Sequence, residues 1–166
     1  MGTKTAMPVD EYLRASFPDL DKEYRDGELV ERSMPDYIHA KTQGLLVAFF
    51  VPLRKTLSLY TCPELRLKLR PGVYLIPDVS LFHPTEPSQR VPDTPPLVVI
   101  EILSEDDRMN AVRDKLQEYR TWGVPHVWLV DPYSKRTYTC NGALKEVATL
   151  SVAELAIEIK PADIFE

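Results

Sequence analysis

The spacing of hydrophobic residues alternates between helical and strand-like periods along this chain, as it does in α/β proteins. Apolar residues recur at helical spacing over residues 36–51, and Pro52 is expected to end that helix. A second amphipathic helix is predicted from about 108 to 123. The nearly continuous apolar runs at 97–103 and 126–131 predict two buried strands, and the helix between them favours a parallel arrangement.

Turn-forming residues divide the first half of the chain into shorter elements. A short helix is expected over residues 8–13, and Asp26-Gly27 predicts a turn that leads into a first strand. Residues 60–70 and 73–82 are predicted to be two strands that form a hairpin through Pro71-Gly72. The first half therefore predicts a strand pair beside the helix at 36–51.

The second half contains a proline-rich stretch and a second hairpin. Residues 83–96 hold too many prolines for a helix and are too polar for the core, so a loop is expected there. Residues 136–148 predict a β-hairpin with a type I′ turn at Asn141-Gly142. The tail, 151–166, is expected to add a short helix and a last packing segment.

One carboxylate, Glu101, interrupts the most apolar of these strands. Burying an unpaired carboxylate would cost several kcal/mol or keep it protonated, so Glu101 requires a partner. A cation is the obvious one, and Asp78 is a second acid that could share it. Pro77 removes a backbone donor beside Asp78, which suggests a strand edge or bulge there. The alternative is an aspartate that merely ends a strand at a turn.

The composition indicates one ordinary globular domain over residues 1–166, with 44% hydrophobic and 27% charged residues. The longest apolar stretch, 45–53, is too short to span a bilayer, and the N-terminus lacks an apolar segment of signal-peptide length. A cytoplasmic protein without a membrane partner is therefore expected. Cys62 and Cys140 are interpreted as free thiols in a reducing compartment.

The net charge of −5 is unusual for a protein that binds nucleic acid, because such proteins carry a basic surplus that neutralises phosphates. There is a local exception. Arg66, Lys68 and Arg70 alternate with apolar residues, so they are expected on one face of a strand. This stripe is either a phosphate-binding surface or a solvated face whose charges discourage edge pairing.

The order of these elements and motifs resembles the core of the PD-(D/E)xK nuclease superfamily. More closely, the chain resembles the Uma-two family of putative restriction endonucleases over about residues 9–165. The resemblance implies an α/β restriction endonuclease-like fold, with a mixed central β-sheet flanked by helices and a C-terminal β-hairpin. It rests on Asp26-Gly27-Glu28-Leu29-Val30, His39, Pro77-Asp78-Val79-Ser80, Glu101-Ile102-Leu103-Ser104, Asp114-Lys115, Tyr119, Trp122-Gly123-Val124 and Val127-Trp128-Leu129-Val130-Asp131-Pro132.

The resemblance also implies a metal site for phosphodiester hydrolysis. Asp78, Glu101 and the backbone carbonyl of Ile102 would hold Mg²⁺ or Mn²⁺, which prefer oxygen ligands. The superfamily places a lysine two residues after the Glu, but this chain has Leu103 there. The role is therefore assigned to Lys115 on the following helix. The alternative is that Lys115 is a surface residue whose stem lies along the apolar stripe.

The expected function is metal-dependent endonucleolytic cleavage of DNA. The alternatives are a catalytically inactive member of the fold that binds DNA or a protein, and a metal-binding domain without nucleic acid. Glu31 and His39 are candidate auxiliary groups at the same strand ends, although a lone histidine at a helix margin is more often structural. Double-strand cleavage requires two sites, which is compatible with a homodimer.

Overall fold

A six-stranded mixed β-sheet forms the centre of the protein in the computed structural model, which describes residues 6–18 and 20–166. Strands β7 and β8 are parallel, as predicted, and the other neighbouring strands are antiparallel. The strands follow the order β10-β9-β8-β7-β6-β3. Their bounds are β3 Tyr60–Pro63, β6 Val79–Phe82, β7 Val98–Ile102, β8 His126–Asp131, β9 Arg136–Cys140 and β10 Leu144–Val147.

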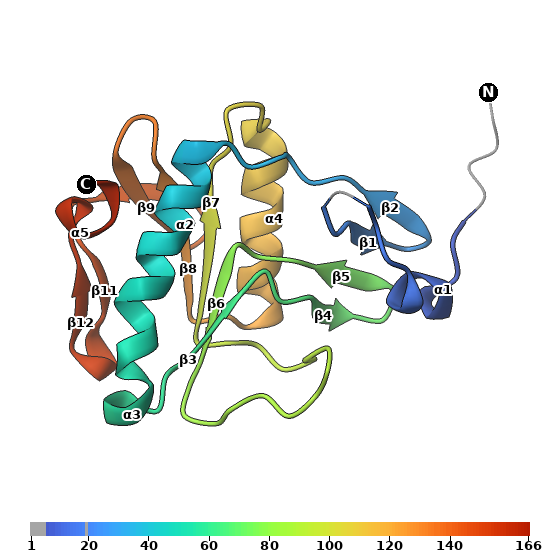
Figure 1. Cartoon of the computed structure of the whole chain (residues 1–166), viewed down its shortest axis with the longest axis horizontal. Helices are drawn as coiled ribbons and strands as arrows, with labels where there is room; N and C mark the ends of the chain where they lie inside the picture. The colour runs from blue at the N-terminus through green and yellow to red at the C-terminus, as the bar shows by residue number, and fades with distance from the viewer. Residues whose placement is uncertain (1–5, 19) are drawn as a thin grey trace.

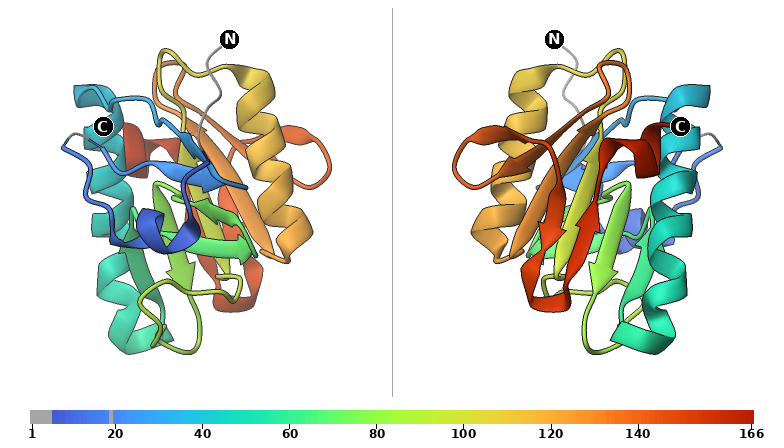
Figure 2. Two further views of the ribbon diagram at one scale, coloured as in Figure 1. Left: turned by 90° about the vertical axis from the view of Figure 1, so that its right-hand side faces the viewer. Right: turned by 90° about the vertical axis from the view of Figure 1, so that its left-hand side faces the viewer.

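Helices cover both faces of this sheet (Figures 1 and 2). Helix α2 lies on one face and α4 on the other, and both expected helices are confirmed. Beside α2 lies a two-stranded sheet formed by the C-terminal tail. The bounds are α2 Tyr37–Phe50, η1 Val51–Leu53, α3 Arg54–Leu57, α4 Met109–Trp122, β11 Leu150–Val152, η2 Ala153–Leu155, β12 Ile157–Ile159 and α5 Pro161–Phe165.

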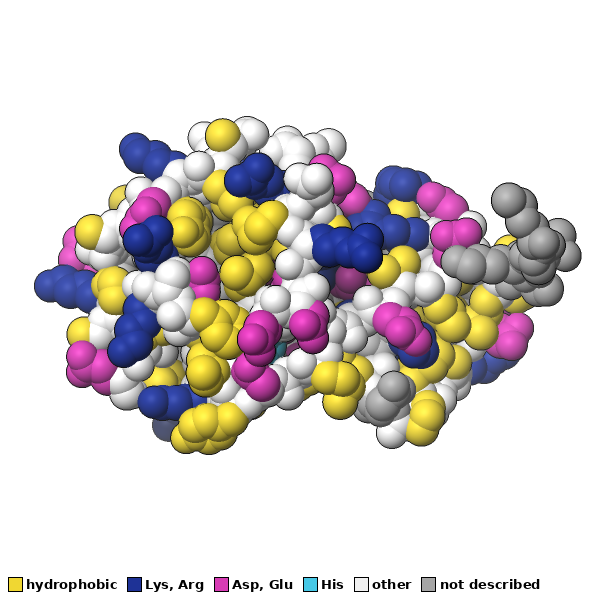
Figure 3. All heavy atoms as spheres, turned by 90° about the horizontal axis from the view of Figure 1, so that it is seen from above, with side chains coloured by type: hydrophobic (Ala, Val, Ile, Leu, Met, Phe, Trp, Pro, Cys, Tyr) yellow, Lys and Arg dark blue, Asp and Glu magenta, His cyan; other side chains and the backbone are white. Residues whose placement is uncertain are grey.

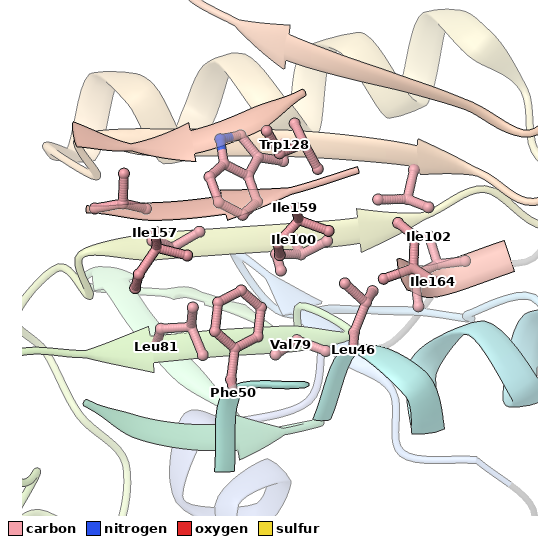
Figure 4. Packing of buried hydrophobic residues seen from close by; sticks show 14 of the residues in the cluster. Leu46, Phe50, Val79, Leu81, Ile100, Ile102, Trp128, Ile157, Ile159 and Ile164 are labelled. Carbon is pink, nitrogen blue, oxygen red and sulfur yellow. The ribbon is translucent and has the colours of Figure 1, made fainter. Parts of the chain in front are cut away.

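Alternate residues of the central strands face the two helical layers, because side chains alternate across a strand. Ile100 and Ile102 pack with Phe50 of α2 and Trp128 of β8 in the larger core cluster (Figure 4). On the opposite face, Val99 packs in a second cluster that includes residues of α4. Glu101 also faces α4, and this alternation places its carboxylate beneath that helix.

A second, smaller sheet lies beside the central one (Figure 1) and corrects the expected hairpin at 60–82. Each of the two expected strands is divided, with one half in each sheet. The breaks fall just after Pro63, where Glu64 has a positive φ of 50°, and at Pro77, which lacks a backbone donor. The smaller sheet follows the order β2-β1-β5-β4, with β1 Glu23–Arg25, β2 Glu28–Val30, β4 Leu67–Arg70 and β5 Val73–Leu75.

Stacked tyrosines hold the smaller sheet to helix α1 (Val9–Arg14), which confirms the short N-terminal helix. The rings of Tyr12 and Tyr24 lie 4.8 Å apart and are stacked.

Helices of the described part of the chain are all too short or too polar to cross a membrane.

One local prediction was wrong. The hairpin between β9 and β10 has a three-residue loop in which Gly142 has a positive φ but Asn141 does not, so its turn is not type I′. Helix α4 begins without a side-chain cap at Arg108. The carboxylate of Asp107 accepts hydrogen bonds from the Ser104 N–H at 2.8 Å and the Ser33 hydroxyl at 2.7 Å.

Asp36 caps helix α2 and ties it to the loop after β8. Its Oδ1 accepts a hydrogen bond from the His39 N–H at 2.8 Å, and its Oδ2 accepts one from the Tyr133 hydroxyl at 2.7 Å. These two bonds lower the pKa of Asp36 below its usual 3.8. Because the folded state favours the charged form, this stabilisation is present above pH 3.8 and is lost as the pH falls below it.

We therefore expect Asp36→Ala to lower the melting temperature at neutral pH, and Asp36→Asn to lower it less, because asparagine also caps helices. The difference between wild type and Asp36→Asn should shrink in thermal unfolding curves recorded from pH 7 down to about pH 3. Asp93→Asn, at an exposed loop position, is the matched control. A difference that is independent of pH would contradict the charged cap.

Candidate active site

Asp78 lies where the chain passes from the smaller sheet into the central one. It directly precedes β6, and its side chain is only 7% exposed. Its Oδ2 accepts a hydrogen bond from the backbone N–H of Ile102 at 2.7 Å. The pairing of Val79 with Ile100 continues the antiparallel register toward Glu101. Asp78, just before β6, and Glu101, on β7, therefore lie at the same end of two adjacent strands.

Glu101 is held by two side chains of α4. Its Oε1 accepts a hydrogen bond from the Tyr119 hydroxyl at 2.9 Å and lies 2.8 Å from Nζ of Lys115. Burial, together with the charges of Asp78 and Glu23, raises the pKa of Glu101 to about 8 against the opposing effect of Lys115. The site thus holds more carboxylates than its own cations fully neutralise.

Glu23 is a third buried carboxylate, whose burial the sequence pattern did not indicate. It begins β1 in the smaller sheet, where a charged residue at the start of a short strand gives no signal of burial. Its Oε2 lies 2.8 Å from Nζ of Lys115 and accepts a hydrogen bond from the Ile76 N–H at 2.7 Å. Lys115 is therefore fixed between Glu23 and Glu101. Although burial disfavours its charged form, these two carboxylates raise the pKa of Lys115.

His39 and Arg32 approach Asp78 from above the strand ends. The Nε2 atom of His39 lies 3.4 Å from Oδ1 of Asp78, and Nη2 of Arg32 lies 3.6 Å from the same oxygen. Burial opposes the charged imidazole, but Asp78 raises the pKa of His39. In turn, His39 and the Ile102 N–H hold the pKa of Asp78 below its usual value in spite of its burial. Asp78 is thus kept ionised.

The other predicted site residues lie farther out. Glu31 is 83% exposed at the rim of the site and pairs with Lys22 at 3.1 Å. Arg66 precedes β4, and its guanidinium lies 4.3 Å from the centre of the Tyr12 ring. Arg70 pairs with Asp26 at 3.3 Å.

The expected basic stripe is therefore interrupted. Strand β4 starts after Arg66, and its register shifts between Lys68 and Arg70. None of the three basic residues is among those that line the cavity over Asp78. Their binding to nucleic acid stays a prediction, as does the role of the Ile102 carbonyl.

These groups surround one cavity of about 230 Å³ between α2 and α4. Viewed from above the strand ends, acidic side chains gather near the middle of the surface, with histidine atoms just visible among them and basic side chains around (Figure 3). The segment from β2 to α2 crosses over this end of the molecule (Figure 1). The cavity is lined by residues of both sheets, of α2 and α4 and of the segments between them, including Glu23, Arg32, His39, Asp78, Glu101 and Lys115.

The donor set fits a hard divalent cation better than a closed structural metal site. Within residues 6–18 and 20–166, no group of three or more His, Cys, Asp or Glu side chains is arranged to hold a metal ion. Mg²⁺ requires only one or two carboxylates, because water and substrate phosphate supply its other ligands. Asp78 and Glu101 provide such a pair, and the surplus negative charge around Glu101 favours an added cation.

The mixed sheet, with Asp78 just before β6, Glu101 on β7 and a lysine on the helix that follows, defines a protein of the restriction endonuclease-like fold class. The crystal structure of a putative nuclease belonging to DUF820 from Anabaena variabilis is similar over 96% of this chain and 97% of that one. Its TM-score is 0.79 and its sequence identity 22%.

The particular family follows from the sequence comparison. The family model described as Uma2, putative restriction endonuclease, matches residues 9–160. The chain therefore belongs to the Uma2 family, which confirms the resemblance found in its motifs. Comparison with curated proteins gives no match.

Proposed function

We propose that this protein is a metal-dependent endonuclease that hydrolyses phosphodiester bonds in DNA. The observation that carries the proposal is the arrangement of Glu101, which contacts Lys115 at 2.8 Å inside the same cavity as Asp78. Two carboxylates and a fixed cation are the groups that metal-assisted phosphoryl transfer requires. Membership of a family described as putative restriction endonucleases supports the same reaction.

Asp78 and Glu101 are the residues that would hold Mg²⁺ or Mn²⁺. When bound, such an ion polarises the scissile phosphate and lowers the pKa of a bound water. Asp78 is already ionised and oriented by the Ile102 N–H, so it needs no rearrangement to act as a ligand. Its position between two sheets limits its movement.

We assign to Lys115 the role that the superfamily gives to a lysine on the strand, two residues after the Glu. The residue at that place, Leu103, packs beside the second core cluster. Lys115 instead extends from α4 and reaches the same carboxylate, Glu101, from the side of the helix. Its charge, fixed by Glu23, is available to stabilise the negative charge that develops on the phosphate in the transition state.

The size of the cavity supports a backbone phosphate as the group that reacts. Pockets that enclose a whole drug-sized ligand measure about 300–1,000 Å³. The cavity here, about 230 Å³, is smaller and its walls are strongly charged. It suits a phosphate with its bound ion, while the rest of a polymer lies outside.

We expect wild-type protein to nick supercoiled DNA in the presence of Mg²⁺ or Mn²⁺, and Glu101→Gln to lose this activity. The loss should be at least about a hundred-fold, because a ligand carboxylate and the partner of Lys115 change together. Nicking is measured on agarose gels while each metal is titrated. Glu158→Gln, an exposed residue of β12, is the matched control and should retain wild-type activity.

Several DNA forms are included so that a restricted substrate is not mistaken for inactivity. They are linear, supercoiled, branched and single-stranded DNA. Wild-type protein that is inert on all of them with both metals would contradict the nuclease proposal. DNA binding without cleavage would instead identify the alternative function, a catalytically inactive binding module of the same fold.

A further inference from the structure

Arg32 is a buried cation whose hydrogen-bonding capacity is unused. It follows β2 on the segment that leads to α2, and its side chain is only 9% exposed. Its Nη1 atom is buried and has no hydrogen-bond partner among the described residues. Its Nη2 lies 3.6 Å from both Oδ1 of Asp78 and Oε1 of Glu64, which is too far for a hydrogen bond.

An unsatisfied guanidinium in this position is unusual. Arginine has five N–H donors and stays charged, and buried polar groups in folded proteins nearly always have partners. Leaving such a donor without an acceptor costs free energy. The nearby carboxylates attract Arg32 electrostatically but do not satisfy its donors. The position therefore requires an acceptor that residues 6–18 and 20–166 do not supply.

The location of Arg32 indicates what that acceptor is. Arg32 lines the cavity that also holds Asp78, Glu101 and Lys115, and it is near Oδ1 of Asp78, whereas the Ile102 N–H donates to Oδ2. His39 is next to it, and the buried Nδ1 of that ring also has no partner among the described residues. Two under-satisfied, nitrogen-bearing groups thus border one cavity.

We propose that Arg32 binds a non-bridging oxygen of the substrate phosphate, with His39 beside it as a second contact. This inference rests on the proposed nuclease function and adds the residue that recognises the phosphate. A guanidinium matches the geometry of phosphate oxygens and can bind two of them at once. A bound phosphate would satisfy the donors that Asp78 and Glu64 leave free.

The acidic walls of the cavity set a condition for this binding. Five carboxylate side chains line the cavity and would repel a phosphate, and four arginine and lysine side chains offset only part of their charge. A divalent cation at Asp78 and Glu101 removes much of that repulsion. Phosphate affinity at Arg32 is therefore expected to be greater with Mg²⁺ than without it.

The test is direct binding, which does not depend on cleavage. Titration calorimetry with the dinucleotide TpT, in Mg²⁺, should show binding to wild-type protein and about ten- to a hundred-fold weaker binding to Arg32→Gln. Thymidine 5′-phosphate is titrated in parallel to distinguish a terminal phosphate from a backbone phosphodiester. Arg136→Gln, which removes an exposed arginine paired with Glu146, is the matched control and should bind like wild type.

Arg32→Lys keeps the positive charge but loses the planar group that can bind two phosphate oxygens at once. It provides a second test of the assignment in case Arg32→Gln does not fold. We expect its affinity to fall between those of wild type and Arg32→Gln, with an unchanged circular dichroism spectrum. Equal binding by wild type and both variants, or no binding of either probe to wild type, would overturn the assignment. Binding of TpT without any cleavage of DNA would support the phosphate site and count only against the nuclease proposal.

Discussion

Replacing Asp78 by asparagine is expected to lower the rate of metal-dependent DNA cleavage by at least about a thousand-fold. The substitution removes one of two ligand charges, and metal stabilisation of the transition state amounts to several kcal/mol, with each 1.4 kcal/mol equal to a factor of ten. The amide oxygen of asparagine can still accept the hydrogen bond that Ile102 donates, so the fold should be retained. Single-turnover cleavage of a labelled duplex measures the rate.

The control for this prediction is Asp93→Asn, an exposed substitution in the proline-rich loop. It should cleave at the wild-type rate. Matching unfolding curves for wild type and Asp78→Asn would show that lost activity does not come from lost structure. A folded Asp78→Asn protein that cleaves within about tenfold of wild type would exclude Asp78 as a metal ligand.

Replacing Lys115 by methionine is expected to reduce the free energy of unfolding by about 3–5 kcal/mol, as other changes that break a buried ion pair do. Lys115 lies 2.8 Å from carboxylate oxygens of both Glu23 and Glu101, and the side chains of these residues are 6% and 12% exposed. Without the ammonium, two buried carboxylates remain close together and unneutralised. Urea unfolding followed by tryptophan fluorescence measures the loss.

A second substitution separates the charge effect from the loss of side-chain contacts. Lys115→Met/Glu23→Gln should recover part of the stability, because one of the two unneutralised charges is removed. Lys145→Met, on the exposed strand β10, is the matched control and should change the stability by less than about 0.5 kcal/mol. If the double variant is no more stable than Lys115→Met, the lysine does not act by neutralising Glu23.

The sequence was most informative where a charge interrupted an apolar pattern. Glu101 stands out in the run 97–103, and Lys115 lies on the flank of the apolar stripe of its helix, so both could be placed near the strand ends. The structure brings them into contact at 2.8 Å, and their catalytic roles remain predictions. The central sheet and its two covering helices were predictable for the same reason, because their hydrophobic periods are long and regular.

The sequence was least informative where contacts join distant segments. Glu23 and Arg32 lie in short, polar stretches whose local pattern resembles surface. Glu23 is buried beside Lys115 of α4, and the Arg32 side chain is enclosed near Glu64 and Asp78. The division of the strands at Pro63 and Pro77 was missed because each half continues the alternating pattern of the other. Only the three-dimensional arrangement shows that the chain changes sheets at those prolines.

The position of Lys115 makes the smaller sheet a part of the proposed active site. Through Glu23 and Glu101, this lysine links one strand of each sheet to α4, and Arg25 adds a second link to that helix through Glu118 at 2.6 Å. Opening of the smaller sheet would therefore withdraw the anchor of the lysine while the central sheet remained folded. The geometry of the proposed site is thus only as stable as the contact between the two sheets. The N-terminal segment contributes to that geometry as directly as the strands of the central sheet do.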